Sequence, residues 1–134
     1  MKNWNRLFQS EAASGVYRLY RDQNIHEVEK AAGLHGLLFI NIDLSGVSAK
    51  EGFLKTVARS LQFPAYFGMN WDAFEECLTD LSWYRAKGFA IVFKDIRAFS
   101  ENDRKESGMA RKILKSAAAF WKKQNTPFYV FMQA

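Results

Sequence analysis

Three short, largely apolar runs mark the chain, at residues 37–44, 89–93 and 128–132. Apolar runs of this length, without helical spacing, are typical of buried strands. The segments between them have the spacing of amphipathic helices instead of tight turns. Because helical crossovers join parallel strands, the pattern predicts an α/β fold with a small parallel β-sheet of three strands and helices packed mainly on one face.

The first crossover is predicted to be a helix that opens at Ser48. Ser48 and Glu51 have the spacing of a capping box, in which the two side chains satisfy backbone N–H groups of the first turn. Phe63 precedes a proline and should end the helix, because the residue before proline is disfavoured in the α region. The apolar stripe in between consists of Phe53, Leu54, Val57 and Leu61.

A second helix is predicted over residues 71–81, with Asn70 as its N-cap. At helical spacing its two sides differ in chemistry. The apolar side holds Trp71, Phe74, Leu78 and Leu81. The opposite side holds Asp72, Glu76, Thr79 and Asp80, with Glu75 near the border. This helix is therefore expected to present an acidic face.

A third helix is predicted after a Ser100-x-x-Asp103 cap, with Gly108 as a candidate interruption. Its periodicity places one set of residues in the core, namely Met109, Ile113, Ala117 and Phe120. The exposed face is predicted to be basic and to carry Arg104, Arg111, Lys115 and Lys122.

The first 36 residues carry weaker patterns, which predict short helices around residues 4–8 and 26–32 and a candidate further edge strand at residues 16–20. A sheet with helices on one face only would leave large residues of the other face in water. We therefore expect residues 1–36 to be an N-terminal extension packed on the same domain as residues 37–134. Its expected packing groups are Trp4, Phe8, Tyr17 and Tyr20.

The composition fits one globular domain of 134 residues, of which 49% are hydrophobic, enough to build a core without disulfides. Cys77 is the single cysteine, so no internal disulfide can form, and a reducing compartment is expected. Two His residues and one Cys match no zinc-ligand spacing, and we expect no cofactor and no metal. No apolar run approaches the ~18 residues of a membrane span, so a cytoplasmic protein without membrane contact is expected.

Charge is distributed unevenly along the chain. The net charge is +5, yet residues 60–84 contain no Lys or Arg and four carboxylates. One interpretation is an ordinary solvated helix face. The other is an interface, because exposable aromatic residues, Tyr66, Trp71 and Trp83, lie beside the acids, as interface anchors do. A magnesium site at Asp72 and Glu76 would need further ligands, for which the sequence offers no motif.

The run from Phe63 to Asp80 reads Phe-Pro-Ala-Tyr-Phe-Gly-Met-Asn-Trp-Asp-Ala-Phe-Glu-Glu-Cys-Leu-Thr-Asp. It resembles the barstar family, with its Pro-x-Tyr-aromatic-Gly-x-Asn-x-Asp-Ala and Asp-Cys-Leu-Thr elements. The order of elements is also similar from about residue 37 onward. The resemblance implies a protein inhibitor of a ribonuclease that performs no catalysis and forms a one-to-one complex. In such a complex the acidic helix enters the nuclease cleft, where its carboxylates stand in for RNA phosphates.

The resemblance also implies which residues contact the partner. Glu76 takes the position of the family's central carboxylate, usually an aspartate, while Glu75 replaces an aromatic contact residue and Asp80 a glycine. Phe120 falls near the place of a further acidic contact. The expected partner-binding residues are Tyr66, Asn70, Trp71, Asp72, Glu75, Glu76, Thr79, Asp80 and Trp83.

Two other classes of function compete with inhibition. The basic face of the third helix could serve a nucleic-acid-binding module, although direct nucleic-acid binding is not the expected activity. An enzyme would need a nucleophile and base or a metal constellation, and the sequence offers neither.

Overall fold

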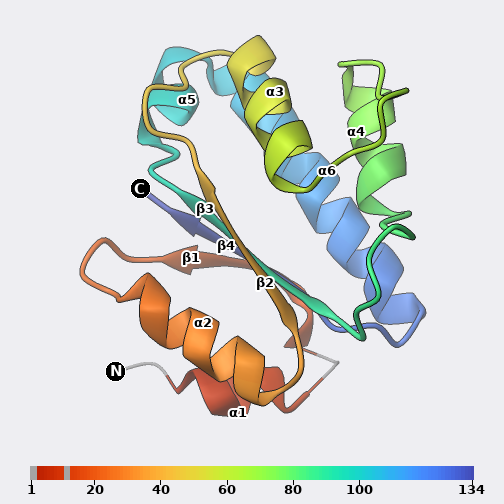
Figure 1. The fold of residues 1–134 in the computed structure, drawn as a ribbon. Helices are drawn as coiled ribbons and strands as arrows, with labels where there is room; N and C mark the ends of the chain where they lie inside the picture. Colours follow the sequence, from red (N-terminus) through yellow and green to blue (C-terminus); the bar gives the residue numbers. More distant parts are fainter. Residues whose placement is uncertain (1–2, 11–12) are drawn as a thin grey trace.

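The computed structural model describes residues 3–10 and 13–134. Its centre is a four-stranded sheet in the order β1-β4-β3-β2, with every neighbouring pair parallel (Figure 1). The strands are β1 (Gly15–Leu19), β2 (Leu38–Asp43), β3 (Phe89–Lys94) and β4 (Phe128–Gln133). The α/β class and the parallel sheet are confirmed, and the candidate N-terminal edge strand raises the strand number to four.

Within the described residues, six α-helices connect and cover the strands, and they lie on both faces of the sheet (Figure 1). One face carries α3 (Lys50–Ser60), α4 (Trp71–Leu78), α5 (Arg97–Asn102) and α6 (Arg104–Lys123). The other face carries α1 (Trp4–Phe8) and α2 (Ile25–Leu34). Most helices therefore lie on one side, as expected, and the N-terminal helices occupy the other.

Alternation along β4 divides the core into two layers. Phe128, Val130 and Met132 belong to the cluster packed with α3 to α6. Tyr129 and Phe131 belong to a second cluster with Trp4 and Phe8. The ring of Trp4 meets Phe131 edge-on at 5.5 Å between centroids, and Phe8 meets Tyr129 in the same way at 4.8 Å.

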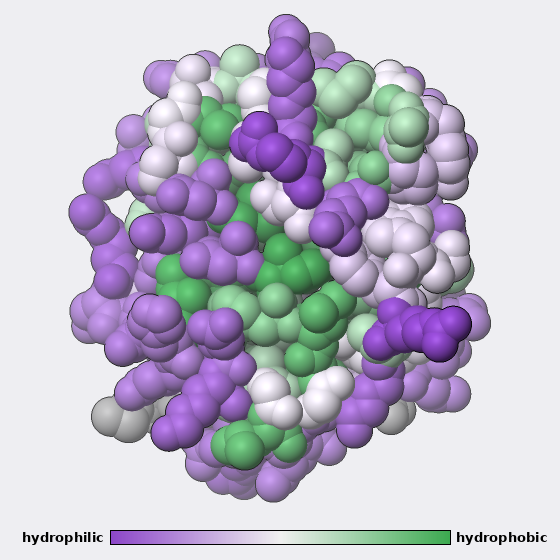
Figure 2. All heavy atoms as spheres, in the orientation of Figure 1, coloured by the Kyte–Doolittle hydropathy of each residue, from purple (hydrophilic) through white to green (hydrophobic). Residues whose placement is uncertain are grey.

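Strand β1 extends the sheet beyond β4. Tyr17 stacks on Phe131 with 5.8 Å between ring centroids, and its hydroxyl donates to the carbonyl of Ala13. Tyr20, which was expected to pack as well, is 56% exposed. It follows the end of β1, where the strand no longer directs side chains onto the sheet. At the opposite edge lies β2, and the apolar band in the middle of Figure 2 runs over the region where β2 faces the viewer in Figure 1.

The start of α3 differs from the prediction. The helix begins at Lys50, its N-cap is Ala49, and no side chain caps it, so the capping box at Ser48 is wrong. Ser48 lies one residue too early to reach the N–H groups of the first turn. Glu51 instead pairs with Lys55 at 3.5 Å, one helical turn along the exposed surface.

The last long helix was predicted in the right region, and its apolar face was right in part, since Ile113 and Ala117 are buried as predicted. Asp103 caps α6 by accepting from the N–H of Glu106, Ser100 belongs to the separate helix α5, and Gly108 lies inside α6 without interrupting it. Met109 and Phe120 are 40% and 39% exposed, contrary to expectation. The buried face is built mostly from small residues, which let the helix lie close to the sheet, and consists of Ala110, Ile113, Leu114, Ala117 and Ala118.

Candidate functional site

The acidic face sits on α4, a short helix whose N-terminus is fixed by Asn70. The side-chain oxygen of Asn70 accepts from the N–H of Ala73 at 2.8 Å, and its amide donates to the carbonyl of Gly68 at 3.2 Å. Asn70 thus ties the preceding loop to the first turn, as an N-cap does. Asp72 lies in that first turn, where the helix dipole favours a negative charge.

The helix ends at Leu78 and not at residue 81 as predicted. Thr79 is the C-cap, and its hydroxyl donates to the carbonyl of Glu75 at 2.9 Å. Leu81 has a φ of +50°, which continues no α-helix, yet its side chain is buried. Leu81 therefore reaches the core from the loop, which explains why its spacing imitated another helical turn.

Three of the four carboxylates, those of Asp72, Glu76 and Asp80, are exposed on one side of this segment. Their spacing of four residues brings successive charges to neighbouring positions. Within the described part of the chain, the ion pairs lie elsewhere, at His26–Glu29, Lys55–Glu51 and Arg97–Glu101. The acidic face therefore carries negative charge that forms no ion pair with a cation of the described residues.

The fourth carboxylate, Glu75, is half-buried and turned toward α6. It accepts a hydrogen bond from the hydroxyl of Ser116 at 3.1 Å. A hollow of about 420 Å³ lies between the two helices and is lined by Asp72, Glu75, Glu76, Thr79, Ser116 and Phe120. Ser116 was missed as a site residue, and Phe120, which the resemblance placed near a contact position, was not among the expected partner-binding residues. Only the packing of α4 beside α6 brings both to the acids.

A second, smaller hollow of about 130 Å³ lies on the other side of Glu76. Tyr66 borders it from the loop before α4 and is 78% exposed. Asp80 borders it from the loop after the helix. Glu76 lines both hollows and is thus central among the acidic residues.

Cys77 also lines the small hollow, but its side chain is buried. Burial raises the pKa of the Cys77 thiol, and the nearby charges of Asp80 and Glu76 act in the same direction. The thiol is therefore protonated at neutral pH and is a poor nucleophile.

Two of the expected contact residues direct their indole N–H groups into the protein. Trp71 donates to the carboxylate of Glu106 at 2.6 Å, and its ring packs against Phe53 and Phe74. Trp83 donates to the carbonyl of Leu61 at 3.0 Å. Both rings are half-buried and pack against the hydrophobic core.

Among the described residues, no group of three or more His, Cys, Asp or Glu side chains is arranged to hold a metal ion. None of the helices in the described residues has the length and apolarity needed to cross a bilayer.

Comparisons with known proteins place this geometry in a wider context. No curated protein matches the chain. A solved structure with a similar fold is that of the ORC2 protein of Aeropyrum pernix in its ADPNP-ADP complexes, with a TM-score of 0.63 and 13% identity. The similarity covers 97% of this chain and 37% of that one, and at such identity it concerns the fold alone.

The family model described as Barstar (barnase inhibitor) matches residues 37–133. The match spans β2 to β4 and includes α4, its preceding loop and α6, which together form the acidic surface. Because the model covers most of the chain and every element of that surface, this protein belongs to the barstar family.

Proposed function

We propose that this protein inhibits a ribonuclease by placing the acidic face of α4 in the nuclease active site. The observation that carries the proposal is the hollow between α4 and α6, which three carboxylates line without an internal cation. A ribonuclease cleft binds RNA phosphates with cationic side chains. Carboxylates held in a row can occupy the phosphate positions and pair with those cations.

The shape of the surface supports insertion of α4 into a cleft. The two hollows beside Glu76 can receive side chains of the partner, and the exposed ring of Tyr66 can pack on the rim. Phe120 adds an apolar wall to the larger hollow. An acidic centre with aromatic groups at its border combines electrostatic steering with burial of apolar area.

The contact set we propose is Tyr66, Asn70, Asp72, Glu75, Glu76, Thr79 and Asp80, with Ser116 and Phe120 added from α6. Trp71 and Trp83 support this surface from below. Asn70 acts by fixing the start of α4 and Thr79 by ending it. Inhibition by such a surface needs no catalysis, no cofactor and only one inhibitor molecule for each nuclease.

A cellular role follows from this mechanism. A host that contains a toxic ribonuclease, its own or a neighbour's, needs a partner that blocks the enzyme in the cytoplasm. We propose that the protein serves as such an immunity protein or antitoxin. A gene for a small secreted or toxin-linked ribonuclease next to its own gene would support this role.

The decisive experiment is a titration of a barnase-type ribonuclease with the wild-type protein, Glu76→Gln and Glu27→Gln. Glu27 is a matched control, since it is an exposed acid in the first turn of α2, on the opposite face of the sheet. Inhibition that is weakened by Glu76→Gln and retained in Glu27→Gln supports the proposal. Full inhibition by Glu76→Gln, or none by the wild-type protein, contradicts it.

The same samples test the nucleic-acid alternative. Binding to single-stranded RNA at low salt that is lost only when the basic residues of α6 are neutralised would favour that function. The exposed positions of these residues on α6 make the comparison straightforward.

A further inference from the structure

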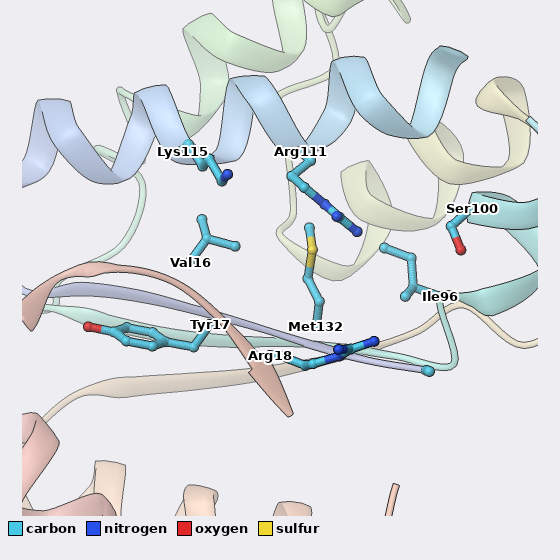
Figure 3. Close-up of a pocket in the computed structure, with 9 residues that line it drawn as sticks. Val16, Tyr17, Arg18, Ile96, Ser100, Arg111, Lys115 and Met132 are labelled. Atoms are coloured by element: carbon cyan, nitrogen blue, oxygen red, sulfur yellow. The ribbon is translucent and has the colours of Figure 1, made fainter. Parts of the chain in front are cut away.

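A second charged hollow lies on the other side of α6, facing β1. It has a volume of about 400 Å³ and is bounded by α6, the end of β4, the start of α5 and the edge strand β1 (Figure 3). Its lining residues are Val16, Tyr17, Arg18, Ile96, Ser100, Arg111, Lys115, Met132 and Ala134. Because Val16 to Arg18 belong to β1, the N-terminal part of the chain completes this hollow.

Three cations border this hollow from two different elements. Figure 3 shows Arg111 and Lys115 extending from α6 toward the sheet, with Arg18 below them on β1. None of the three takes part in the ion pairs of the described residues. The guanidinium of Arg18 lies over the ring of Tyr20, at 5.6 Å from the ring centroid.

No Asp or Glu side chain lines the hollow to balance these charges. Positive charge is therefore in excess among the side chains that line the hollow. Like charges brought together without a counterion repel one another. An anion bound between them would relieve this repulsion.

The inner wall of the hollow is apolar. Ile96 and Met132 are almost fully buried, and Val16 is half-buried beside them. Figure 3 shows Met132 and Ile96 between the two arginines. A hollow with an apolar wall and a few convergent polar groups is typical of a small-molecule site. The ligand that fits has an anionic head and an apolar body.

We propose that this hollow binds a small organic phosphate, a phosphate monoester with an apolar or aromatic group. A phosphate monoester carries about −1.5 to −2 charges at pH 7 and three acceptor oxygens, which suits three cations. Arginine can donate two parallel hydrogen bonds to one phosphate, and Arg18 and Arg111 approach from two sides. The ester group then covers Ile96 and Met132.

The positions of the basic residues on α6 favour a small ligand over a nucleic-acid strand. Arg104 and Lys122 share the exposed face of the helix with Arg111 and Lys115 but do not line the hollow. A polymer backbone would use the whole helix face. Only Arg111 and Lys115, in the middle of the helix, line the hollow, together with Arg18 from β1.

The test uses calorimetric titration of the full chain with phenyl phosphate, inorganic phosphate and phenol at low salt. Phenyl phosphate should bind one-to-one and more tightly than inorganic phosphate, because only the ester covers the apolar wall, and phenol should not bind measurably. The double variant Arg111→Gln/Lys115→Gln should weaken phenyl phosphate binding about tenfold or more, since it removes charge-assisted hydrogen bonds.

Arg104→Gln/Lys122→Gln is the matched control, with the same charge change on the same helix face outside the hollow. It should change the affinity less than about twofold, because distant exposed charges are screened. Thermal melts followed by circular dichroism check that both double variants remain folded. The readout is ligand binding, so it is independent of nuclease inhibition.

Three results would overturn the proposal. The first is no saturable binding of phenyl phosphate to the wild-type protein. The second is equal weakening by both double variants, which would indicate general attraction along the helix. The third is tighter binding of a single-stranded RNA oligonucleotide that depends on all four basic residues, which would assign the face to nucleic acid.

Discussion

The hollows on the two sides of α6 carry opposite charge. The side facing α4 borders a hollow of about 420 Å³ with three carboxylates, and the side facing β1 borders a hollow of about 400 Å³ with three cations. The net charge of +5 conceals this division. Net charge therefore says little about what a face can bind, because each site responds to its local charge. Variants in one hollow can therefore be compared with variants in the other.

The largest expected effect is on stability and comes from removing the N-terminal part. This part contains β1, which forms one wall of the hollow with three cations. Deleting residues 2–34 should lower the free energy of unfolding by several kcal/mol. The deletion removes the buried rings of Trp4 and Phe8, and without them Tyr129 and Phe131 are exposed to water. Phe8→Ala alone should cost about 3–5 kcal/mol. Urea unfolding curves measure both changes.

This deletion also tests whether residues 1–36 belong to the same folding unit as the rest, as we propose. An unchanged unfolding midpoint in the truncated protein would show that they do not. Phe120→Ala is a useful reference, since its ring is 39% exposed and should cost less than Phe8→Ala.

The next effect concerns the acidic side. Glu76→Gln should weaken nuclease binding by about 2 kcal/mol or more, because it leaves a cation of the nuclease unpaired. The fold should stay intact or gain a few tenths of a kcal/mol, since a like-charge neighbour is removed. Inhibition titrations and thermal melts measure the two quantities. Higher salt should weaken binding of the wild-type protein.

Lys115→Gln, on the opposite side of α6, is the reference for Glu76→Gln. It should leave inhibition almost unchanged. Should Lys115→Gln abolish inhibition while Glu76→Gln has no effect, the roles of the two sides have been assigned in reverse.

Trp71→Phe should have a smaller effect, on stability more than on binding. The variant keeps a ring against Phe53 and Phe74 but removes the N–H that donates to Glu106. A lost hydrogen bond to a partly buried carboxylate should lower the free energy of unfolding by about 1–2 kcal/mol. Melting curves measure this loss, and a parallel inhibition assay should show a nearly unchanged affinity. A large loss of affinity without a loss of stability would make Trp71 a direct contact.

The smallest effect concerns Cys77. Burial raises the pKa of its thiol, so the reactive thiolate is scarce at neutral pH and becomes more abundant only as the pH rises above the ordinary thiol range. Alkylation by iodoacetamide at pH 7, followed by mass spectrometry, should be slower than that of an exposed peptide thiol. Equal rates would contradict the burial of this group.

The strands were predictable from the sequence because parallel strands covered on both sides read as short apolar runs. The short strand β1 was also predicted near its observed position. The buried faces of the helices were less predictable, because a search for helical spacing gives large apolar residues more weight than alanines. Met109 and Phe120 suggested the buried side of α6, whereas Ala110, Leu114 and Ala118 occupy much of it.

The acidic face of α4 could be predicted from one element, because its charges lie within one short segment. The recess beside it could not, since Ser116 and Phe120 come from a helix about 40 residues further on. The directions of Trp71 and Trp83 were also beyond the sequence, as their hydrogen-bond partners, Glu106 and the Leu61 carbonyl, are distant along the chain. The roles of the expected contact residues stay predictions for the experiments above.

The position of β4 in the middle of the sheet also affects how the chain folds. Gly15 in β1 pairs with Tyr129 in β4, so β1 cannot join the sheet until β4 has left the ribosome. Pairing across such a sequence separation slows folding, because a long loop must close before its contacts stabilise it. Until then, β1 and the edge of β3 that pairs with β4 have no neighbouring strand. The nascent protein is therefore most exposed to aggregation and to chaperone binding just before β4 emerges.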